Sequence, residues 1–173
     1  MKHKLIFILL FICATLISGC ESEWQRYSYK EYRFSVLLPS TWKKETGLYK
    51  TVLIAKAPIK SPNQRFQENI TVVVTQLPQT IDLTTYFEAN KDALTKGLSS
   101  IAEVSEGTIL AGRLEGKWIS FEGKMQDLTL KIISAAWMKN NYIYVISCAS
   151  EAGEFNKYAP IFDRIMRSLR IQK

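Results

Sequence analysis

Residues 32–42, YRFSVLLPSTW, alternate apolar and polar side chains at first and then end in a proline and a tryptophan. Such alternation is typical of a β-strand with one face in a core. Pro39 would end this strand, because proline has no N–H to donate to a neighbouring strand. Tyr27 and Tyr29 precede it at the same spacing, separated from it by the polar residues 30 and 31. We therefore expect residues 27–38 to form a short β-hairpin.

Two more strands are expected before the chain changes its period. Residues 51–59 (TVLIAKAPI) are the first, and residues 69–77 (NITVVVTQL) are the second. From residue 82 to residue 98, apolar side chains recur every three or four positions, which is typical of an amphipathic helix lying on a sheet. Asp82 is a suitable N-cap for this helix.

Residues 102–149 return to strand periodicity, with turn signals between four segments. We expect an antiparallel meander of strands at 102–111, 114–122, 127–138 and 141–149. The last strand is apolar on both faces, so it should lie in the centre of the sheet. A closing helix follows, and we place its regular part from Tyr158 onward, because Pro160 is tolerated in a first turn and not in a helix interior.

Several of these segments together resemble the PsbP-like superfamily. They are the strand and turn at 32–42, the amphipathic helix, the meander, and the closing KYAPIFDRIMRSLR at 157–170. That superfamily includes the extrinsic photosystem protein PsbP, the Ran-binding Mog proteins and envelope lipoproteins of the DcrB type. The resemblance implies an α+β fold, with a twisted antiparallel sheet of about six to seven strands and helices packed on its faces. It also implies an accessory or partner-binding module, since no catalytic residue belongs to the matching motifs.

The N-terminal residues 1–19 have the layout of a secretory signal peptide, with Lys2 and Lys4 before an apolar run. That run, residues 5–17, is shorter than the roughly 20 residues that a membrane-spanning helix needs. The segment LISGC, which ends at Cys20, resembles the lipobox of bacterial lipoproteins and implies cleavage before Cys20 and acylation of that residue. A plain signal peptide with an incidental cysteine and a short signal anchor are the alternatives.

We accordingly divide the chain into a signal peptide at 1–19, a lipidated cysteine with a short tether at 20–26, and one domain at 27–173. The lipid on Cys20 would hold the protein on the membrane, because several acyl chains on one residue anchor it stably. Trp24 lies in the tether, where its ring could rest in the membrane interface. Glu21 is not the aspartate that resembles an inner-membrane retention signal, which favours the outer membrane, facing the periplasm, in a Gram-negative cell.

The residue types exclude several kinds of site. The only histidine, His3, lies in the signal segment, so the rest of the chain lacks the Ser/His and Cys/His pairs of nucleophilic catalysis. Cys148 stands in an apolar strand, and we expect it to pack in the core. A histidine-free hydrolase would need paired carboxylates or a Ser/Lys unit. The candidate carboxylates stand beside turn signals, where we expect solvated hairpin ends: Glu103, Glu106, Glu115, Glu122 and Asp127. We therefore expect a protein without catalytic activity, cofactor or metal.

The chain is basic, with 23 Lys and Arg against 16 Asp and Glu and a net charge of +7. Because an exported protein seldom meets nucleic acid, we expect no nucleic-acid partner and an attraction to anionic envelope components instead. One basic stretch is either a solvated loop or a face for such a partner: Lys43, Lys44, Lys50, Lys56, Lys60 and Arg65. The partner that we expect is an envelope protein.

An apolar ligand is the alternative. Six aromatic residues either pack in the core or line a groove between helix and sheet: Trp42, Tyr86, Trp118, Trp137, Tyr142 and Tyr144. A groove in that place is a common site for small ligands. It would make the protein a carrier or sensor of a small apolar or lipid-like molecule.

Overall fold

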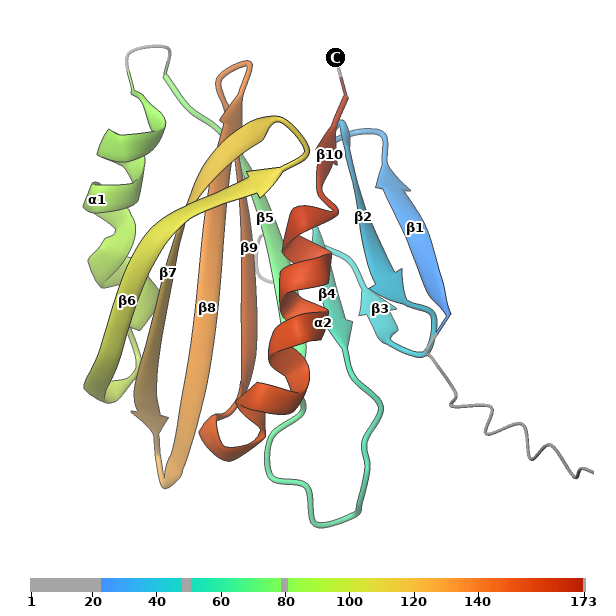
Figure 1. The fold of residues 1–173 in the computed structure, drawn as a ribbon, viewed down its shortest axis with the longest axis vertical. Coiled ribbons are helices and arrows are strands. Elements are labelled where there is room, and N and C mark those ends of the chain that lie inside the picture. The colour runs from blue at the N-terminus through green and yellow to red at the C-terminus, as the bar shows by residue number, and fades with distance from the viewer. Residues whose placement is uncertain (1–22, 48–50, 79–80, 173) are drawn as a thin grey trace, which may run out of the picture.

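The computed structural model describes residues 23–47, 51–78 and 81–172, which include ten β-strands and two α-helices (Figure 1). The strands are β1 (Trp24–Tyr29), β2 (Phe34–Pro39), β3 (Lys43–Glu45), β4 (Leu53–Lys56), β5 (Asn69–Gln76), β6 (Ser99–Ala111), β7 (Leu114–Met125), β8 (Leu128–Lys139), β9 (Tyr142–Glu151) and β10 (Arg170–Ile171). The helices are α1 (Leu83–Thr95) and α2 (Phe155–Arg167), and a 3-10 turn, Ala152–Glu154, leads into α2. Within the described ranges, no helix combines the length and the apolar character that crossing a membrane requires.

The strands form two antiparallel sheets (Figure 1). The large sheet has seven strands in the order β3-β4-β5-β9-β8-β7-β6, and the small sheet has three in the order β1-β2-β10. The α+β class and the large seven-stranded sheet confirm the prediction from the sequence. The predicted hairpin is present as β1 and β2, but it belongs to the small sheet, where β2 also pairs with β10.

The predicted meander is confirmed as β6 to β9, in which each strand pairs with the next. β9 lies between β8 and β5 and is covered on both faces. Its Tyr144, Ile146 and Cys148 belong to the core beneath α2, whereas Ile143 belongs to a smaller core beneath α1. The central position expected for this strand is therefore correct.

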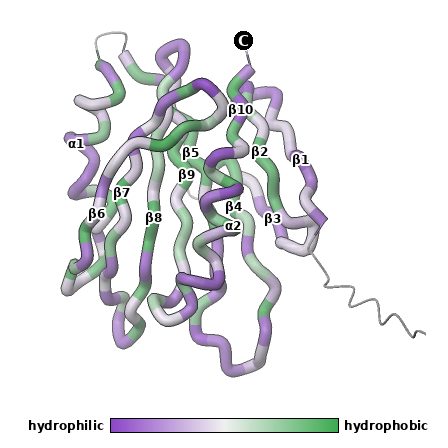
Figure 2. The backbone as a smooth tube through the Cα atoms, viewed as in Figure 1, coloured by the Kyte–Doolittle hydropathy of each residue, from purple (hydrophilic) through white to green (hydrophobic). Residues whose placement is uncertain are grey.

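The two helices lie on opposite faces of the large sheet. α2 buries Tyr158, Phe162 and Ile165 in the main core, and Figure 2 shows hydrophilic positions recurring along it, as expected of a helix with one exposed side. α1 buries only Phe87, in the smaller core. Asp82 caps α1 as predicted, since its carboxylate accepts a hydrogen bond of 2.8 Å from the backbone N–H of Thr85.

Some boundaries differ from the prediction. β3 and β10 were not expected, because two or three residues carry no detectable period. α2 begins at Phe155, before the predicted start at Tyr158, and Pro160 lies in its interior, where the buried aromatic face offsets the lost backbone hydrogen bond. β1 begins at Trp24, so residues 24–26 belong to the small sheet. Cys20, the expected lipidation site, lies outside the described residues.

Candidate functional site

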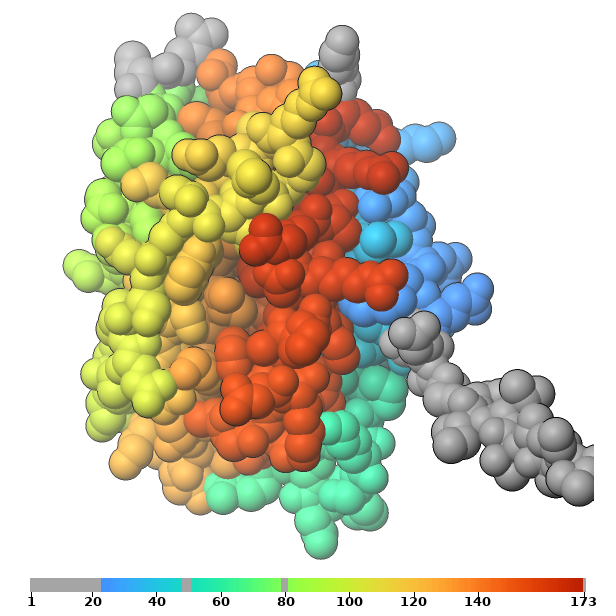
Figure 3. Space-filling model, in the orientation of Figure 1, coloured from blue at the N-terminus to red at the C-terminus, as the bar shows by residue number. Residues whose placement is uncertain are grey.

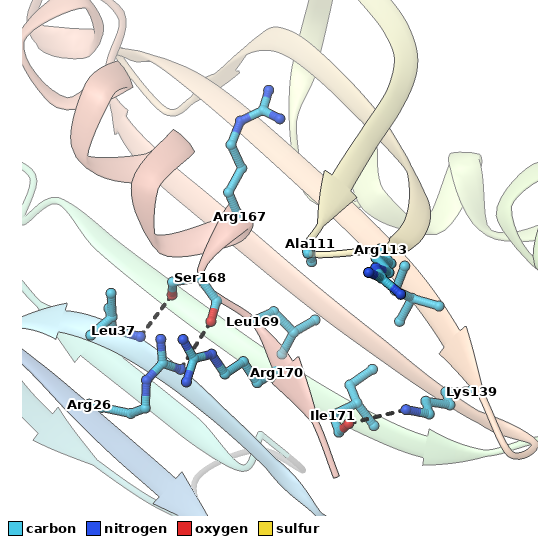
Figure 4. Close-up of a pocket in the computed structure, with 12 residues that line it drawn as sticks. Arg26, Leu37, Ala111, Arg113, Lys139, Arg167, Ser168, Leu169, Arg170 and Ile171 are labelled. Atoms are coloured by element: carbon cyan, nitrogen blue, oxygen red, sulfur yellow. Dashed lines mark hydrogen bonds between the residues drawn. The ribbon is translucent and has the colours of Figure 1, made fainter. Parts of the chain in front are cut away.

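A pocket of about 510 Å³ opens where the small sheet meets the large one. β1 and β2 line one side of it, the β6–β7 turn lines another, and the end of α2 with β10 lies between them (Figure 4). On the face drawn in Figure 3, α2 and the residues after it lie between β6 and β1. We call this the seam pocket and define it by its lining: Arg26, Leu37, Ala111, Gly112, Arg113, Leu114, Lys139, Arg167, Ser168, Leu169, Arg170 and Ile171.

The charge of the seam pocket is one-sided. Its lining contains no acidic residue and the following basic residues: Arg26, Arg113, Lys139, Arg167 and Arg170. A concave surface lined by one sign of charge concentrates the electric field and attracts ions of the opposite sign. Guanidinium groups also bind carboxylate and phosphate oxygens through paired hydrogen bonds. The arrangement can therefore bind an anionic group.

Two hairpin turns bring Arg113 and Lys139 to the pocket. Gly112 has a φ of +63° at the first position of the two-residue β6–β7 turn, which places Arg113 at the tip. Lys139 ends β8 just before Asn140 and Asn141, whose φ angles of 53° and 61° are those of a type I′ turn. Alternate turns of an antiparallel meander lie at the same end of the sheet, so these two cations meet there.

The small sheet contributes Arg26 and Arg170. Arg26 pairs with Leu37 across β1 and β2, and Arg170 pairs with Ser35 across β10 and β2. Leu37 and Ser35 are two positions apart on β2, so both arginines lie on the same face, one on each side of that strand. Burial, and next the positive charge of Arg170, lower the pKa of the Arg26 guanidinium from its usual value. The pair thus carries positive charge without a counter-charge in the lining.

Hydrogen bonds fix the position of Arg26. Its guanidinium donates to the Ser35 hydroxyl at 3.1 Å. It also donates to the Ser168 carbonyl at 3.0 Å (Figure 4). The second bond satisfies a carbonyl at the C-terminal end of α2, which has no partner within the helix. The Ser168 hydroxyl in turn accepts a hydrogen bond of 2.8 Å from the backbone N–H of Leu37. These contacts tie the end of α2 to the small sheet.

The other cations differ in how firmly they are engaged. Lys139 donates to the Ile171 carbonyl at 3.2 Å. Arg167 forms an ion pair with Asp163 at 2.7 Å and points away from the other labelled cations in Figure 4. The side chains of Arg113 and Arg170 make no hydrogen bond or ion pair within the described part of the chain. Arg113 and Arg170 are therefore the cations most available to an incoming anion.

The basic stretch expected from the sequence lies elsewhere, and its first part is compensated. Lys43 and Lys56 are cross-strand partners on β3 and β4, and both form ion pairs with Glu45, at 3.1 and 2.9 Å. Lys44 donates to the Tyr27 hydroxyl at 2.8 Å. The structure therefore brings these three lysines onto one small ribbon, where each has an intramolecular partner.

The second part of that stretch lies on the loop between β4 and β5. Lys60 forms an ion pair with Glu154 at 3.4 Å, and Arg65 forms one with Asp127. Lys50 lies outside the described residues. No described residue of the expected face lines the seam pocket.

The carboxylates considered as catalytic candidates do not form an acid and base pair. Glu103 and Glu122 both bind Lys131, at 2.7 and 3.2 Å, and the hydrogen bond from Lys131 lowers the pKa of Glu103. A general acid needs the opposite shift. The other candidates are exposed: Glu106, Glu115 and Asp127. Across the described ranges, no group of three His, Cys, Asp or Glu residues could hold a metal ion.

Three of the six aromatic candidates are buried in the core. Trp42, Trp137 and Tyr144 are buried beneath α2. Cys148 is also completely buried there, as predicted, and burial raises the pKa of its thiol. Trp24 has the guanidinium of Arg164 over its ring at 4.3 Å, which attaches the start of β1 to the exposed side of α2.

A smaller cavity, of about 230 Å³, lies beneath α1. The hydroxyls of Ser134 and Ser147, 2.8 Å apart, belong to its lining on the sheet side. Tyr86 lines this cavity, Trp118 lines a separate pocket of about 260 Å³ beneath α2, and Tyr142 lines neither. We call it the α1 cavity and define it by its lining: Val73, Tyr86, Phe87, Asn90, Ala93, Leu94, Ser134, Ala136, Val145 and Ser147.

Sequence reasoning missed the seam pocket because its cations are far apart along the chain. Arg26 and Arg170 come together only when the two ends of the chain pair in the small sheet. A signal for Arg113 and Lys139 did exist, since both stand next to turn residues of the predicted meander, at the end where alternate turns meet.

Neither a protein-family model nor a curated protein sequence matches the chain. Solved structures do match. The cyanobacterial PsbP protein CyanoP of Synechocystis sp. PCC 6803 has a TM-score of 0.65 at 12% identity, over 89% of this chain and 95% of that protein. LpqN of Mycobacterium tuberculosis, described as involved in cell envelope biogenesis, has a TM-score of 0.67 at 10% identity, over 81% and 83%. The Ran-binding protein Mog1p of Saccharomyces cerevisiae has a TM-score of 0.55 at 13% identity, over 87% and 96%. The chain therefore has the PsbP-like fold that its sequence resembles.

Proposed function

We propose that the protein is a bacterial envelope lipoprotein, anchored through Cys20, whose domain is a non-catalytic binding module that presents the seam pocket to an anionic envelope component. The observation that carries this proposal is that basic side chains from β1, β10 and two hairpin turns line one pocket whose lining has no acid. LpqN, described as involved in cell envelope biogenesis, accords with a place in the envelope. Mog1p, described as Ran-binding, accords with a binding role.

The anchor is tested by metabolic labelling with an alkyne fatty acid. The wild-type protein should incorporate the label, and Cys20→Ala should not. Cys148→Ala is the matched control, because it removes a buried cysteine of the core and should leave labelling unchanged. Cleavage of the Cys20→Ala protein at the same site, with a mature mass that differs from the wild type only by the substitution, would contradict the anchor.

The binding site is tested by photo-crosslinking in cells. A photoreactive residue at Leu110, which is exposed and precedes the pocket-lining Ala111, should capture an envelope component. Capture should fall when Arg113→Glu and Arg170→Glu are added. A photoreactive residue at Ile59, exposed on the loop after β4, is the control position. A protein captured at Leu110 would be the envelope partner expected from the sequence, and equal capture at both positions would contradict the seam pocket.

The basic face expected from the sequence is tested in parallel. Lys43→Gln with Lys44→Gln should leave capture at Leu110 unchanged, because both lysines already have partners on their own side of the molecule. If this variant lost the captured component while Arg113→Glu with Arg170→Glu kept it, the binding site would belong to the β3–β4 ribbon.

The α1 cavity favours a second function, that of a carrier for a small apolar ligand. Its volume of about 230 Å³ is below the roughly 300–1,000 Å³ typical of drug-sized ligand sites, so the ligand would be small. Native mass spectrometry of the detergent-extracted protein should then show a bound molecule that is lost in Ala93→Trp, since that substitution fills the cavity. A protein without bound mass in both forms would contradict the carrier function.

A further inference from the structure

We infer that the seam pocket binds the phosphate group of an anionic phospholipid in the membrane that carries the protein, and that this contact holds the domain against the bilayer in one orientation. The inference rests on the proposed function, because it needs the anchor at Cys20. It goes beyond that function by naming the anionic component and the chemistry that recognises it.

The positive charge of the seam pocket has no acidic counterpart in its lining. Asp163, the acid that engages a lining cation, binds Arg167, which points away from the other cations (Figure 4). Arg26 and Arg170 lie on one face of the small sheet with no acid in the lining. A bound anion would relieve the repulsion between these two guanidinium groups.

The arrangement of the cations favours a tetrahedral anion over a planar one. The cations stand on separate walls: Arg26 and Arg170 on the small sheet, Arg113 and Lys139 on the hairpin turns (Figure 4). One guanidinium can occupy both oxygens of a carboxylate through its paired donors. A phosphate offers more oxygens in a tetrahedral arrangement, so it can contact cations on opposite walls at once. A pocket of about 510 Å³ also has room for a headgroup around that phosphate.

The seam pocket lies within a short chain length of the proposed anchor. Arg26 follows Cys20 by six positions in the sequence. An extended chain spans at most about 3.6 Å per residue, so Arg26 lies within roughly 22 Å of the lipidated cysteine. Anionic lipids attract basic groups held this near to the membrane surface. Trp24, which is half-buried beneath Arg164, starts the same strand and belongs to the residue type that favours membrane interfaces.

The test uses the full, lipidated protein in nanodiscs and measures hydrogen exchange of the β6–β7 turn and of residues 168–172. Exchange in both segments should be at least about tenfold slower with phosphatidylglycerol than with phosphatidylcholine alone, as expected for several cations that each gain about a fivefold factor near an anionic surface. Arg113→Glu with Arg170→Glu should abolish the difference. These two residues are exposed and make no side-chain hydrogen bond in the described chain, so the variant should fold.

The matched control reverses two exposed cations at a distance from the pocket. Lys96 is the C-cap residue that follows α1. Lys124 lies near the C-terminal end of β7, and the β6–β7 turn lies at the other end of that strand. Lys96→Glu with Lys124→Glu changes the net charge by the same amount and should keep the protection by phosphatidylglycerol. Loss of protection in this control as well would show attraction by net charge and would overturn the inference.

Two further arms identify the source of the anion. Nanodiscs that contain oleic acid carry negative charge without phosphate, and equal protection by oleate would overturn recognition of phosphate. Inorganic phosphate added to phosphatidylcholine nanodiscs tests the free ion, and protection by it at a concentration below that of the lipid would make the pocket a site for free phosphate. Absence of lipid protection, together with a protein captured at Leu110, would overturn this inference and leave the proposed function standing.

Discussion

The two faces of the large sheet are covered in different ways. Beneath α2, aromatic rings interlock, since Phe162 stacks on Tyr158 and meets Trp42 edge to face, and all three are buried. Beneath α1, Phe87 is the only residue of the helix that is buried, over a cavity of about 230 Å³, whereas α2 buries four residues and also borders a pocket of about 260 Å³. α2 is therefore a part of the main core, whereas α1 is a cover over the opposite face.

Because the two faces differ in this way, a ligand can be held rigidly on the α2 side, whereas the α1 side can open. The seam pocket is built on the α2 side, where Ser168 joins the end of the helix to Leu37 and Arg26. Side chains held by packing and hydrogen bonds are suited to binding a group in one fixed geometry. The α1 cavity lies under few buried contacts, and segments of that kind open at low free-energy cost. An anion would thus bind at the seam without rearrangement, and an apolar ligand would enter beneath α1.

Paired substitutions of the two phenylalanines test the comparison most strongly. Phe162→Ala should lower the free energy of unfolding by about 5 kcal/mol, because the side chain is completely buried among other rings, and Phe87→Ala by about 3 kcal/mol, because Phe87 is the only buried residue of α1 and packs in the smaller core. Urea unfolding followed by circular dichroism measures both. Equal losses, or a larger loss for Phe87→Ala, would contradict the distinction between core and cover.

A glycine on the α2 side tests how tightly that face is packed. A Cβ atom on Gly116 would lie 2.5 Å from the indole of Trp137 and 2.6 Å from the backbone carbonyl of Ala136, so Gly116→Ala must relieve both clashes. We expect a loss of about 3 kcal/mol in the free energy of unfolding. Gly153→Ala is the control, because nothing lies within 4 Å of its added Cβ, and its thermal midpoint should stay near that of the wild type. A wild-type midpoint for Gly116→Ala would show that this face has room to spare.

Thiol labelling compares the opening of the two faces on adjacent residues of β9. Cys148 faces the main core and Ser147 faces the α1 cavity. Because burial raises the pKa of the Cys148 thiol and α2 excludes the reagent, labelling of native Cys148 should require global unfolding. A cysteine at position 147, introduced as Ser147→Cys with Cys148→Ala, should react at least about 100-fold faster through local opening of α1. Peptide mass spectrometry measures both rates, and similar rates would mean that α1 opens no more easily than α2.

The pH dependence of α1 is the smallest expected effect. The hydrogen bond from the Thr85 N–H lowers the pKa of Asp82 from its ordinary value of 3.8. A carboxyl group with a lowered pKa in the folded state stabilises that state above its unfolded pKa, and the contribution is lost as the pH falls through the folded pKa. Hydrogen exchange in α1 should therefore rise several-fold relative to α2 as the pH falls below 3.8. Asp82→Asn keeps a capping side chain that does not titrate and should remove this dependence; the same rise in that variant would assign it to another group.

Much of the fold could be predicted from short-range patterns. The strands β6 to β9 followed from alternating side chains and from turn residues such as Asn140 and Asn141, whose positive φ angles suit a tight hairpin. The start of α1 followed from Asp82, a local capping signal. The separation into two sheets did not follow, because the pairing of β2 with β10 joins residues at opposite ends of the chain. The early start of α2 also did not follow, because the burial that offsets Pro160 is a long-range effect.

The candidate site was less predictable than the fold. Counting basic residues along the chain selected Lys43 and its neighbours, which the structure pairs with Glu45, Tyr27 and other partners. Arg113 and Arg170 make no such pairs within the described residues, although Arg113 stands alone among unlike neighbours in the sequence and Arg170 follows Arg164 and Arg167. A cluster of basic residues in the sequence does not show that their charges are unpaired in the folded protein. A binding site for an anion depends on the unpaired charges.

Residue types and their spacing over a few positions were enough to predict the class of the fold, the meander, the place of Cys148 in the core and an anchor at Cys20. The folded structure was needed to find which cations stay without an ion pair among the described residues, and that Arg26, Arg113, Lys139 and Arg170 line one pocket. Ion pairing and pocket formation depend on distances across two sheets and a helix, which no local period encodes.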